Sequence, residues 1–577
     1  MHHYGFWKTM VKPLCALGLT LSLGLGMAAC TQNQPTETTT QPTEAATTQP
    51  EAQQSGFSVT VTVPQDFEGE LNGRCLIAFA EDTSEAQPYE QIDLYGVPVF
   101  GKTVYGLTAG DTITFTPQDA EIIGFPFTLS ELPAQDFSVQ AFFITYTQFE
   151  RSNGSVIWGM ADQGGGGDFH VNPGNYYSDV VETSVDVSGQ QEISLTLNQM
   201  IPMPELEEDQ VAQQGNYEDT DMVKYVKIKS QLLTDFWGQD IYIGANVLLP
   251  HDYDPNKEYP ALYYQGHFPR GSAPLSYGTN EEFTAWWDSG EAPQMVVVTI
   301  RDANMYYDTS YSVNSENLGP WGDAIHQELI PYLEETFHLI DESWARLLSG
   351  GSTGGWESLA LQVFYPDFYG GTWSLCPDSV SFEHYQVVNL YEDENAYYLD
   401  QGWFQVARPG SVALDGNVKY AMKDENLYEA AVGGLQCQSL GQWAIWEAVY
   451  GPMGEDGYPE RVYDPMTGVI NKDVAAYWGE HYDLTKYLQN NWSEIGESLV
   501  GKLHIRGGDM DAYYLNQAQY VLGDWLETTT EPYYEGYCIT FPRKGHTGNI
   551  TNQELLTEMA EHMMKYGPEN VSEILFG

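Results

Sequence analysis

Basic side chains are scarce in this 577-residue chain, which has 23 Lys and Arg against 81 Asp and Glu and a formal charge of −58. Binding to nucleic acid and adhesion to an anionic membrane surface both rely on Lys and Arg. The shortage therefore excludes both kinds of partner. Acidic disordered chains are poor in aromatic residues, whereas this chain is 14% aromatic and 42% hydrophobic. Its length and apolar content predict two or more folded domains.

Cysteine is also scarce, with six in the whole chain. Cys15 and Cys30 lie near the N-terminus, which leaves four for the rest. This number is too small for a disulfide scaffold, and neither a CxxC pair nor a Cys/His cluster indicates a zinc site. Cys376 and Cys437 can form a disulfide or remain free thiols, and the sequence is compatible with both alternatives. The sequence implies no metal and no cofactor.

The apolar run near the N-terminus is too short for a comfortable transmembrane helix. Lys8 and Lys12 precede this run, residues 14–27, and small residues follow it directly before Cys30. These features are typical of an export signal over residues 1–29. The segment resembles a bacterial lipoprotein signal, which implies lipid attachment at Cys30. We therefore expect export and anchoring at the bacterial cell surface, with an uncleaved membrane anchor as the alternative.

Composition and periodicity divide the chain that follows. Residues 30–56 are rich in Thr, Gln, Pro and Glu, which predicts a flexible tether. Residues 57–202 contain short alternating runs between Gly, Asp and Pro clusters, which predicts an antiparallel β-sandwich. We expect this sandwich to be a spacer or packing module, with glycan binding as the alternative. Four consecutive glycines, 164–167, predict a mobile loop, and residues 203–221 predict an acidic linker.

From residue 222 onward, the pattern alternates between strands and helices. Three apolar runs, 246–249, 261–264 and 295–300, are among the expected strands. Such alternation predicts a mostly parallel sheet with helices on both faces over residues 222–577. About 120 residues, 379–499, separate two consecutive strands and must form their own structure. We expect them to make a lid over the site, with a peripheral decoration as the alternative.

Residues 350–354 form a G-x-S-x-G pentapeptide around Ser352. A short apolar strand precedes the motif and a helix-forming segment, 356–364, follows it. In such an elbow the glycines allow a tight turn that lifts a serine hydroxyl out of the sheet. The amide of Thr353 opens the helix and can stabilise an oxyanion. Ser352 is therefore the candidate nucleophile, with a structural serine in a glycine-rich turn as the alternative.

A serine nucleophile of this kind needs a histidine base later in the chain. Among the five histidines after Ser352, His562 falls in an expected helix and His504 in an expected strand. His546 lies in a loop after the last expected strand, residues 537–541. We therefore favour His546 as the base.

The acid that orients this base is expected between the serine and the histidine. Asp511 comes just after an expected strand, residues 502–506, and before a helix. We favour Asp511, although it can also serve as a helix cap. Asp509 is the second choice and Asp378, after an earlier strand, is the third.

The motifs at 350–355, 508–511 and 545–546 together resemble the putative-esterase family of α/β-hydrolases. This family includes feruloyl esterases, S-formylglutathione hydrolases, enterochelin esterases and mycolyltransferases. The resemblance covers roughly residues 222–577 and implies an α/β-hydrolase fold and a serine carboxylic-ester hydrolase. It implies that Ser352 is the nucleophile, Asp511 the acid and His546 the base.

Family members also keep an oxyanion-donating loop after an early strand, usually with the order His-Gly. The corresponding stretch here is Gln265-Gly266-His267-Phe268, in which the order differs. We favour the amide of His267 or Phe268 as the donor that acts beside Thr353. The segment 319–322 is similar to one that lines the site in such proteins, which implies that Trp321 is a pocket wall; a buried core Trp is the alternative.

These features predict an exported serine esterase. Its expected substrates are acyl or feruloyl esters on glycans, because a surface-tethered enzyme meets polymers. An acyltransferase on the same scaffold and a non-catalytic substrate-binding lipoprotein remain alternatives. The net charge of −58 repels a polyanionic ferric catecholate siderophore, which argues against the enterochelin-esterase option.

Overall fold

The computed structural model describes residues 56–577. The expected export signal, the tether up to residue 55 and the lipidation site Cys30 lie outside the described residues. Residues 56–577 belong to one compact unit, so the expected boundaries at 202 and 222 stay predictions. Within the described part of the chain, no helix is long and apolar enough to cross a membrane.

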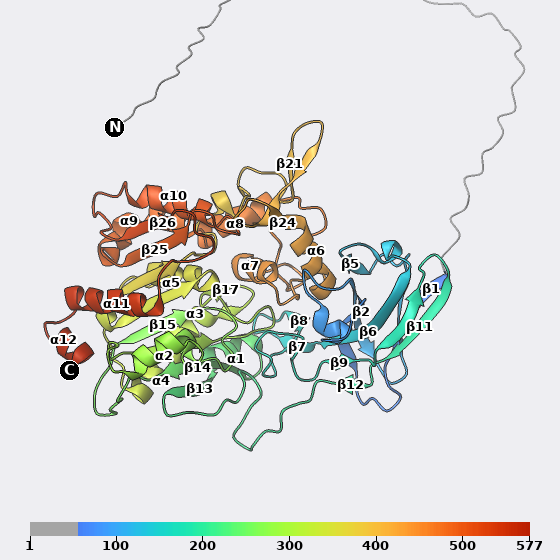
Figure 1. Ribbon diagram of the computed structural model, residues 1–577, viewed down its shortest axis with the longest axis horizontal. Helices are drawn as coiled ribbons and strands as arrows, with labels where there is room; N and C mark the ends of the chain where they lie inside the picture. Colours follow the sequence, from blue (N-terminus) through green and yellow to red (C-terminus); the bar gives the residue numbers. More distant parts are fainter. Residues whose placement is uncertain (1–55) are drawn as a thin grey trace, which may run out of the picture. The chain divides into compact units, whose positions relative to one another are not determined.

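Residues 56–200 form two β-sheets that share one apolar core (Figure 1, blue to cyan). The smaller sheet consists of β1 (Gly56–Thr62), β4 (Thr112–Phe115) and β11 (Gln190–Thr196). The larger sheet consists of β2 (Leu71–Ala80), β3 (Val99–Leu107), β5 (Ile123–Phe125), β6 (Gln135–Thr145), β9 (Tyr176–Tyr177), β10 (Val181–Val185) and β12 (Gln199–Met200). Val59 and Val61 both face the core, as the alternating pattern predicted.

The expected β-sandwich is therefore confirmed, with one difference. Strands β1 and β11 pair in parallel rather than antiparallel. A parallel pair needs a long connection between its strands, and here the strands of the larger sheet supply it. A short hairpin, β7 (Thr147–Glu150) and β8 (Val156–Gly159), projects from the same region.

The second part of the described chain is built on an eight-stranded sheet with the order β13-β14-β16-β15-β19-β20-β25-β26. The last six strands in this order run parallel, and β14 runs antiparallel to both of its neighbours. The strands are β13 (Val223–Ser230), β14 (Ile241–Leu248), β15 (Ala261–Gln265), β16 (Val296–Arg301), β19 (Arg346–Gly351), β20 (Gly371–Leu375), β25 (Leu503–Gly508) and β26 (Tyr537–Phe541). The expected α/β-hydrolase fold is confirmed.

Helices cover both faces of this sheet (Figure 1). One face carries α2 (Glu281–Asp288), α11 (Asn552–Tyr566) and α12 (Val571–Phe576). The other face carries α1 (Gln231–Trp237), α4 (Ile330–Phe337), α5 (Thr353–Phe364), α9 (Leu484–Leu499) and α10 (Asn516–Leu526). In β16, Val297 packs in the apolar core beneath α2, α11 and α12, and Val298 packs in the apolar core on the opposite face of the sheet. This strand is therefore buried on both faces, as its continuous apolar run predicted.

The helix expected over residues 324–337 is present in three pieces. It begins as α3 (Trp321–Ala324), passes through a π-helical turn (Ile325–Leu329) and continues as α4. Pro331 lies just after the π turn and lacks the N–H that a regular helical hydrogen bond needs. The wider π turn directly before it accommodates the proline without ending the helix. A two-stranded ribbon precedes these helices, made of β17 (Asn314–Ser315) and β18 (Gly319–Pro320).

The insertion at 379–499 has structure of its own, as its length predicted. It contains α6 (Met422–Gly433), α7 (Gln442–Tyr450) and α8 (Lys472–His481), and α9 closes it. Two hairpins complete it, β21 (Tyr398–Asp400) with β22 (Gln405–Ala407) and β23 (Pro409–Val412) with β24 (Val418–Ala421). Trp443, Trp446 and Trp478 are buried and join the core of the main sheet. The insertion therefore packs onto the hydrolase core through its tryptophans.

Candidate active site

The carboxyl ends of the parallel strands bring the candidate residues to one edge of the sheet. The loop after β15 carries His267, and the turn after β19 carries Ser352. The loops after β20, β25 and β26 carry Asp378, Asp511 and His546. In open parallel sheets this edge is where ligands bind. The structure therefore gathers residues that are up to 279 positions apart in the sequence.

Ser352 sits in a strained elbow between β19 and α5, with φ 58° and ψ −119°. A residue other than glycine adopts such a positive φ only where its surroundings hold it there. The flanking residues must be glycines, because a side chain at either position would not fit. A Cβ at Gly350 would lie 2.4 Å from the Gly354 carbonyl oxygen, and one at Gly354 would lie 2.2 Å from the Gln265 carbonyl oxygen. The G-x-S-x-G spacing is thus explained by close backbone packing around the serine.

His546 and Asp511 form a buried pair. The Nδ1 atom of His546 lies 2.6 Å from Oδ2 of Asp511, whose other oxygen accepts the Tyr513 amide at 2.9 Å. Burial opposes the positive charge of His546, but the hydrogen bond and charge of Asp511, with the charge of Asp378, raise the pKa of His546 above its usual value. Asp509 instead accepts the Arg543 amide at 2.6 Å. Of the three acids considered from sequence, Asp511 is thus the one that contacts His546.

Ser352 and His546 line one cavity of about 350 Å³. The hydroxyl of Ser352 donates to Oδ1 of Asp378 at 3.4 Å, and no hydrogen bond joins Ser352 to His546. The insertion supplies much of the remaining wall, through Gln386, Glu425, Gln442, Trp443 and Trp446. The segment expected to form a lid therefore contributes directly to the cavity around Ser352.

Asp378 is the centre of a network that sequence reasoning missed. Its buried Oδ2 accepts the Tyr311 hydroxyl at 2.7 Å and the Trp446 indole N–H at 3.2 Å. The Thr353 hydroxyl also donates to this oxygen, at 3.2 Å. Burial raises the pKa of Asp378, although these hydrogen bonds and the charge of His546 favour its ionised form. The only sequence signal was an Asp shortly after a strand end, because its partners come from three distant segments.

The two candidate oxyanion donors in the loop after β15 differ in the structure. The Phe268 amide already donates to Oδ2 of Asp308 at 2.6 Å. The amides of His267 and Thr353 have no acceptor within residues 56–577. Burial, reinforced by the charge of His546, lowers the pKa of the His267 side chain to about 4. Of the two candidates, His267 is the one whose amide is free.

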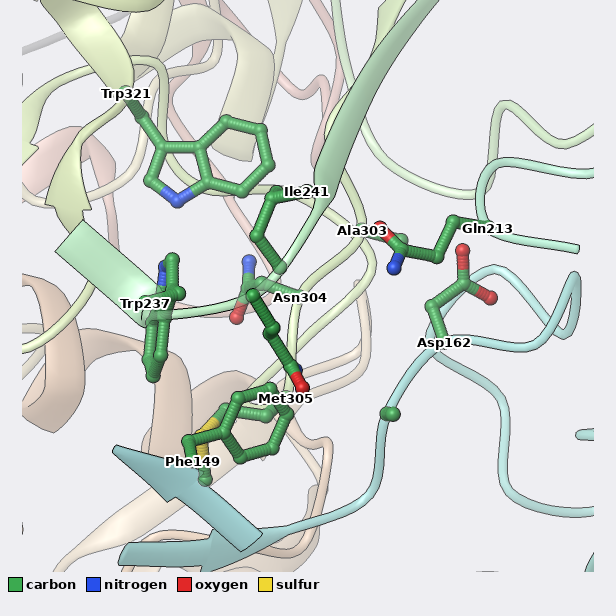
Figure 2. Close-up of a pocket in the computed structure, with 11 residues that line it drawn as sticks. Phe149, Asp162, Gln213, Trp237, Ile241, Ala303, Asn304, Met305 and Trp321 are labelled. Atoms are coloured by element: carbon green, nitrogen blue, oxygen red, sulfur yellow. The ribbon is translucent and has the colours of Figure 1, made fainter. Parts of the chain in front are cut away.

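Trp321 does not line the Ser352 cavity. Figure 2 shows it on the wall of a different cavity, together with Trp237 and Ile241. Its side chain is 1% exposed and belongs to the core of the hydrolase region. The expectation of a pocket wall came from resemblance, and the structure instead matches the alternative of a buried core Trp.

The remaining candidates for special chemistry are the cysteines and the acidic side chains. Cys376 and Cys437 are both buried free thiols, so they form no disulfide with each other. Among residues 56–577, no group of three or more His, Cys, Asp or Glu side chains is placed to hold a metal ion.

Comparison with known proteins gives a family match for the part of the chain that contains Ser352. Residues 240–489, which include Ser352 but neither Asp511 nor His546, match the family described as "Putative esterase". The comparison with curated proteins found no match to this chain. The resemblance inferred from the motifs is thereby confirmed.

Several solved structures are similar to part of the chain. A ferulic acid esterase is 14% identical, with a TM-score of 0.34, and the alignment covers 59% of this chain and 99% of that one. An S-formylglutathione hydrolase from Staphylococcus aureus is 12% identical, with a TM-score of 0.33 and coverage of 59% and 99%. A ferulic acid esterase from Anaeromyces mucronatus, in complex with ferulic acid, is 14% identical, with a TM-score of 0.27 and coverage of 60% and 92%. The matched residues 240–489 lie within the region that has the α/β-hydrolase fold, so the family match and the observed fold agree for this part of the chain.

Proposed function

We propose that the protein is a serine esterase in which Ser352 is the nucleophile, His546 the general base and Asp511 the orienting acid. One observation carries this proposal. Ser352 projects from a strained elbow into the same cavity as His546, whose Nδ1 is held by Asp511 at 2.6 Å. Nucleophile, base and orienting acid in this chain order are the parts that acyl transfer by a serine requires.

The reaction begins when the Ser352 hydroxyl turns from Asp378 toward Nε2 of His546. Oγ attacks the ester carbonyl as Nε2 takes its proton, and Asp511 stabilises the resulting imidazolium. The amides of Thr353 and His267 donate to the oxyanion. The intermediate collapses as His546 returns the proton to the leaving alcohol. Water then attacks the acyl-enzyme in the same way, which releases the acid and restores Ser352.

The cavity walls favour an uncharged substrate that carries a ring. Trp443, Trp446 and Tyr513 supply aromatic surface, and no Lys or Arg among residues 56–577 lines the cavity. Two carboxyl groups do line it, and burial raises the pKa of Glu425 to about 7 against hydrogen bonds from neighbouring side chains. A carboxylate on the substrate would therefore enter without a compensating cation. Feruloyl or acyl esters on neutral glycans meet these requirements.

The proposed location is the outside of a bacterial cell, with a lipid on Cys30. The support is the sequence pattern of residues 1–30 alone. In a bacterial host, Cys30→Ala is expected to move the protein from the membrane fraction to a soluble fraction. An unchanged membrane fraction would contradict lipid anchoring at this residue.

Release of acid from a polysaccharide panel tests the activity and its substrate class. The parent protein should release ferulate or acetate from at least one neutral feruloylated or acetylated glycan. Ser352→Ala should release none, because the nucleophile is absent. Absence of release by the parent across the whole panel would contradict the glycan-ester proposal.

A further inference from the structure

The oxyanion loop, residues 266–270, has a backbone conformation that needs external support. Phe268 has φ 59° and Arg270 has φ 31°, both in the left-handed region that side chains disfavour. Such strain persists only where neighbouring structure holds the chain in place. Asn246 supports the C-terminal side of the loop, since its amide donates to the carbonyl oxygens of Arg270 and Ser272, both at 2.8 Å. The rest of the support comes from another region of the chain.

The β-sandwich region binds the side chain of Arg270. Nη2 of Arg270 lies 2.6 Å from Oδ2 of Asp168, and Nδ1 of His170 lies 3.0 Å from the other oxygen of the same carboxylate. The second ring nitrogen of His170 lies 3.0 Å from the Ile92 carbonyl oxygen, which fixes the histidine. Burial opposes the charge of Asp168, but hydrogen bonds from His170 and Arg270 lower its pKa to about 2. Asp168 therefore presents a fixed carboxylate to the oxyanion loop.

The glycine run at 164–167 packs against the same loop and its neighbour. A Cβ at Gly166 would lie 2.9 Å from Cγ of Arg270. A Cβ at Gly167 would lie 2.6 Å from both Cα and N of Asp308. Asp308 is the residue that accepts the Phe268 amide at 2.6 Å. Only glycine allows the two backbones to approach this closely.

The glycine run is also held by hydrogen bonds to Asp162, within the β-sandwich region. Oδ1 of Asp162 accepts the amides of Gly164 and Gly166 at 2.9 and 3.0 Å. The mobility expected of this loop stays a prediction, but the glycines have a second reason to be there, since they allow close packing and positive φ. The run therefore contacts the hydrolase region through Arg270 and Asp308, and its own region through Asp162.

We propose that residues 164–168 position the oxyanion loop, which makes the β-sandwich region a part of the catalytic apparatus rather than a spacer. Asp168 acts through Arg270, and Gly167 acts through Asp308 and the Phe268 amide. Asp168 and Gly167 are thus positioning residues. The inference rests on the proposed function, in which the His267 amide, one residue before Phe268, donates to the oxyanion.

A double-mutant cycle between Asp168 and Arg270 tests the ion pair. Asp168→Asn keeps the shape of the side chain and removes its charge, and we expect kcat to fall about 10-fold with little change in KM. Arg270→Gln should have a similar effect, and the double variant should be no worse than either single one, because all three break the same contact. Tyr458→Phe is the matched control. It removes hydrogen bonds between Tyr458 and the backbone of Trp158 in the β-sandwich region, leaves the Asp168–Arg270 pair in place, and should leave kcat unchanged.

A pair of glycine variants tests the close packing. Gly167→Ala should also lower kcat about 10-fold, because its Cβ displaces Asp308 and with it the oxyanion loop. Gly69→Ala is the control, since Gly69 also has a positive φ, +91°, but nothing lies within 4 Å of its Cβ position. The strain of an alanine at positive φ is common to both variants. A difference in kcat between them therefore reports the contact.

Hydrogen–deuterium exchange gives a readout that does not depend on activity. Asp168→Asn and Gly167→Ala should speed exchange at the amides of residues 266–270, and the two controls should not. Unchanged kcat and unchanged exchange in both variants would overturn the inference and leave the proposed function standing. A parent without esterase activity would overturn the proposed function, while exchange would still test the support of the loop.

Discussion

Two loops follow neighbouring strands of the main sheet, and each carries a buried Asp toward the Ser352 cavity. The loop after β25 carries Asp511, whose carboxylate contacts His546 and two backbone amides. The loop after β20 carries Asp378, whose carboxylate contacts Ser352 and a set of neutral donors from distant segments, namely Tyr311, Thr353, Gln442 and Trp446. The two carboxylates therefore have different partners in the same small space.

This difference shows that the partner, rather than the position after a strand, decides what a carboxylate does. His546 follows β26, whose only neighbour in the sheet is β25, so its ring reaches the loop after β25. Asp378 forms no ion pair within residues 56–577, and burial raises its pKa. We infer that Asp511 orients the base, while Asp378 holds the resting Ser352 hydroxyl and adds negative charge near His546. The following predictions test this division of roles.

The largest effect is expected from Asp511→Asn. The amide cannot hold His546 in the tautomer that leaves Nε2 free to accept a proton, so kcat should fall about 10,000-fold. Steady-state hydrolysis of a simple neutral ester measures this. Asp509→Asn is the matched control on the same loop, because Asp509 contacts the Arg543 amide instead. A larger loss in Asp509→Asn than in Asp511→Asn would reverse the assignment.

Asp378→Asn should lower kcat by about 10-fold to 100-fold. The change removes a negative charge near His546 but leaves the Asp511–His546 pair in place, so the loss is smaller than for Asp511→Asn. The same ester assay measures it. Equal losses in the two variants would show that the two carboxylates are not distinct in role.

The pH profile sharpens the comparison further. His546 must be neutral to accept a proton, so kcat/KM should fall as the pH drops through its pKa, which Asp511 and Asp378 raise above 6.5. Asp378→Asn removes one of the two charges and should move this midpoint to lower pH. The dependence of kcat/KM on pH, measured from about pH 4 to 9, checks this shift. This is about the range in which histidines titrate in proteins. A midpoint that stays fixed would contradict the electrostatic role of Asp378.

The smallest effect is expected from Trp446→Phe. This change removes one hydrogen bond to Asp378 from the insertion and keeps an aromatic ring, so kcat should fall about 5-fold. Trp403→Phe is the control, since Trp403 is 99% exposed at the tip of the β21–β22 hairpin. Equal activity of Trp446→Phe and Trp403→Phe would show that Trp446 does not act on Ser352 through Asp378.

Much of the fold was predictable because its signals are local. The alternating runs of the β-sandwich, the apolar run of β16 and the G-x-S-x-G elbow each depend on residues close in sequence. Ser352, Asp511 and His546 were chosen from their places after strands, and the structure brings them to one edge of the sheet. Their catalytic roles stay predictions.

What was not predictable depends on contacts between distant segments. The set around Asp378 joins side chains from residue 311 to residue 446, and no local pattern links them. The occupied Phe268 amide depends on Asp308, and the packed glycine run depends on Arg270 of another region. Periodicity reports which face of an element is buried, but not which partner covers it.

Reaction with a fluorophosphonate probe tests whether Ser352 is the nucleophile, because the probe forms a covalent bond with an activated serine. We expect the parent protein to be labelled, the adduct to map to Ser352, and Ser352→Ala to stay unlabelled. We also expect much slower labelling of Asp511→Asn than of Asp509→Asn. An unlabelled parent, or an adduct that persists in Ser352→Ala, would contradict the proposed role of Ser352.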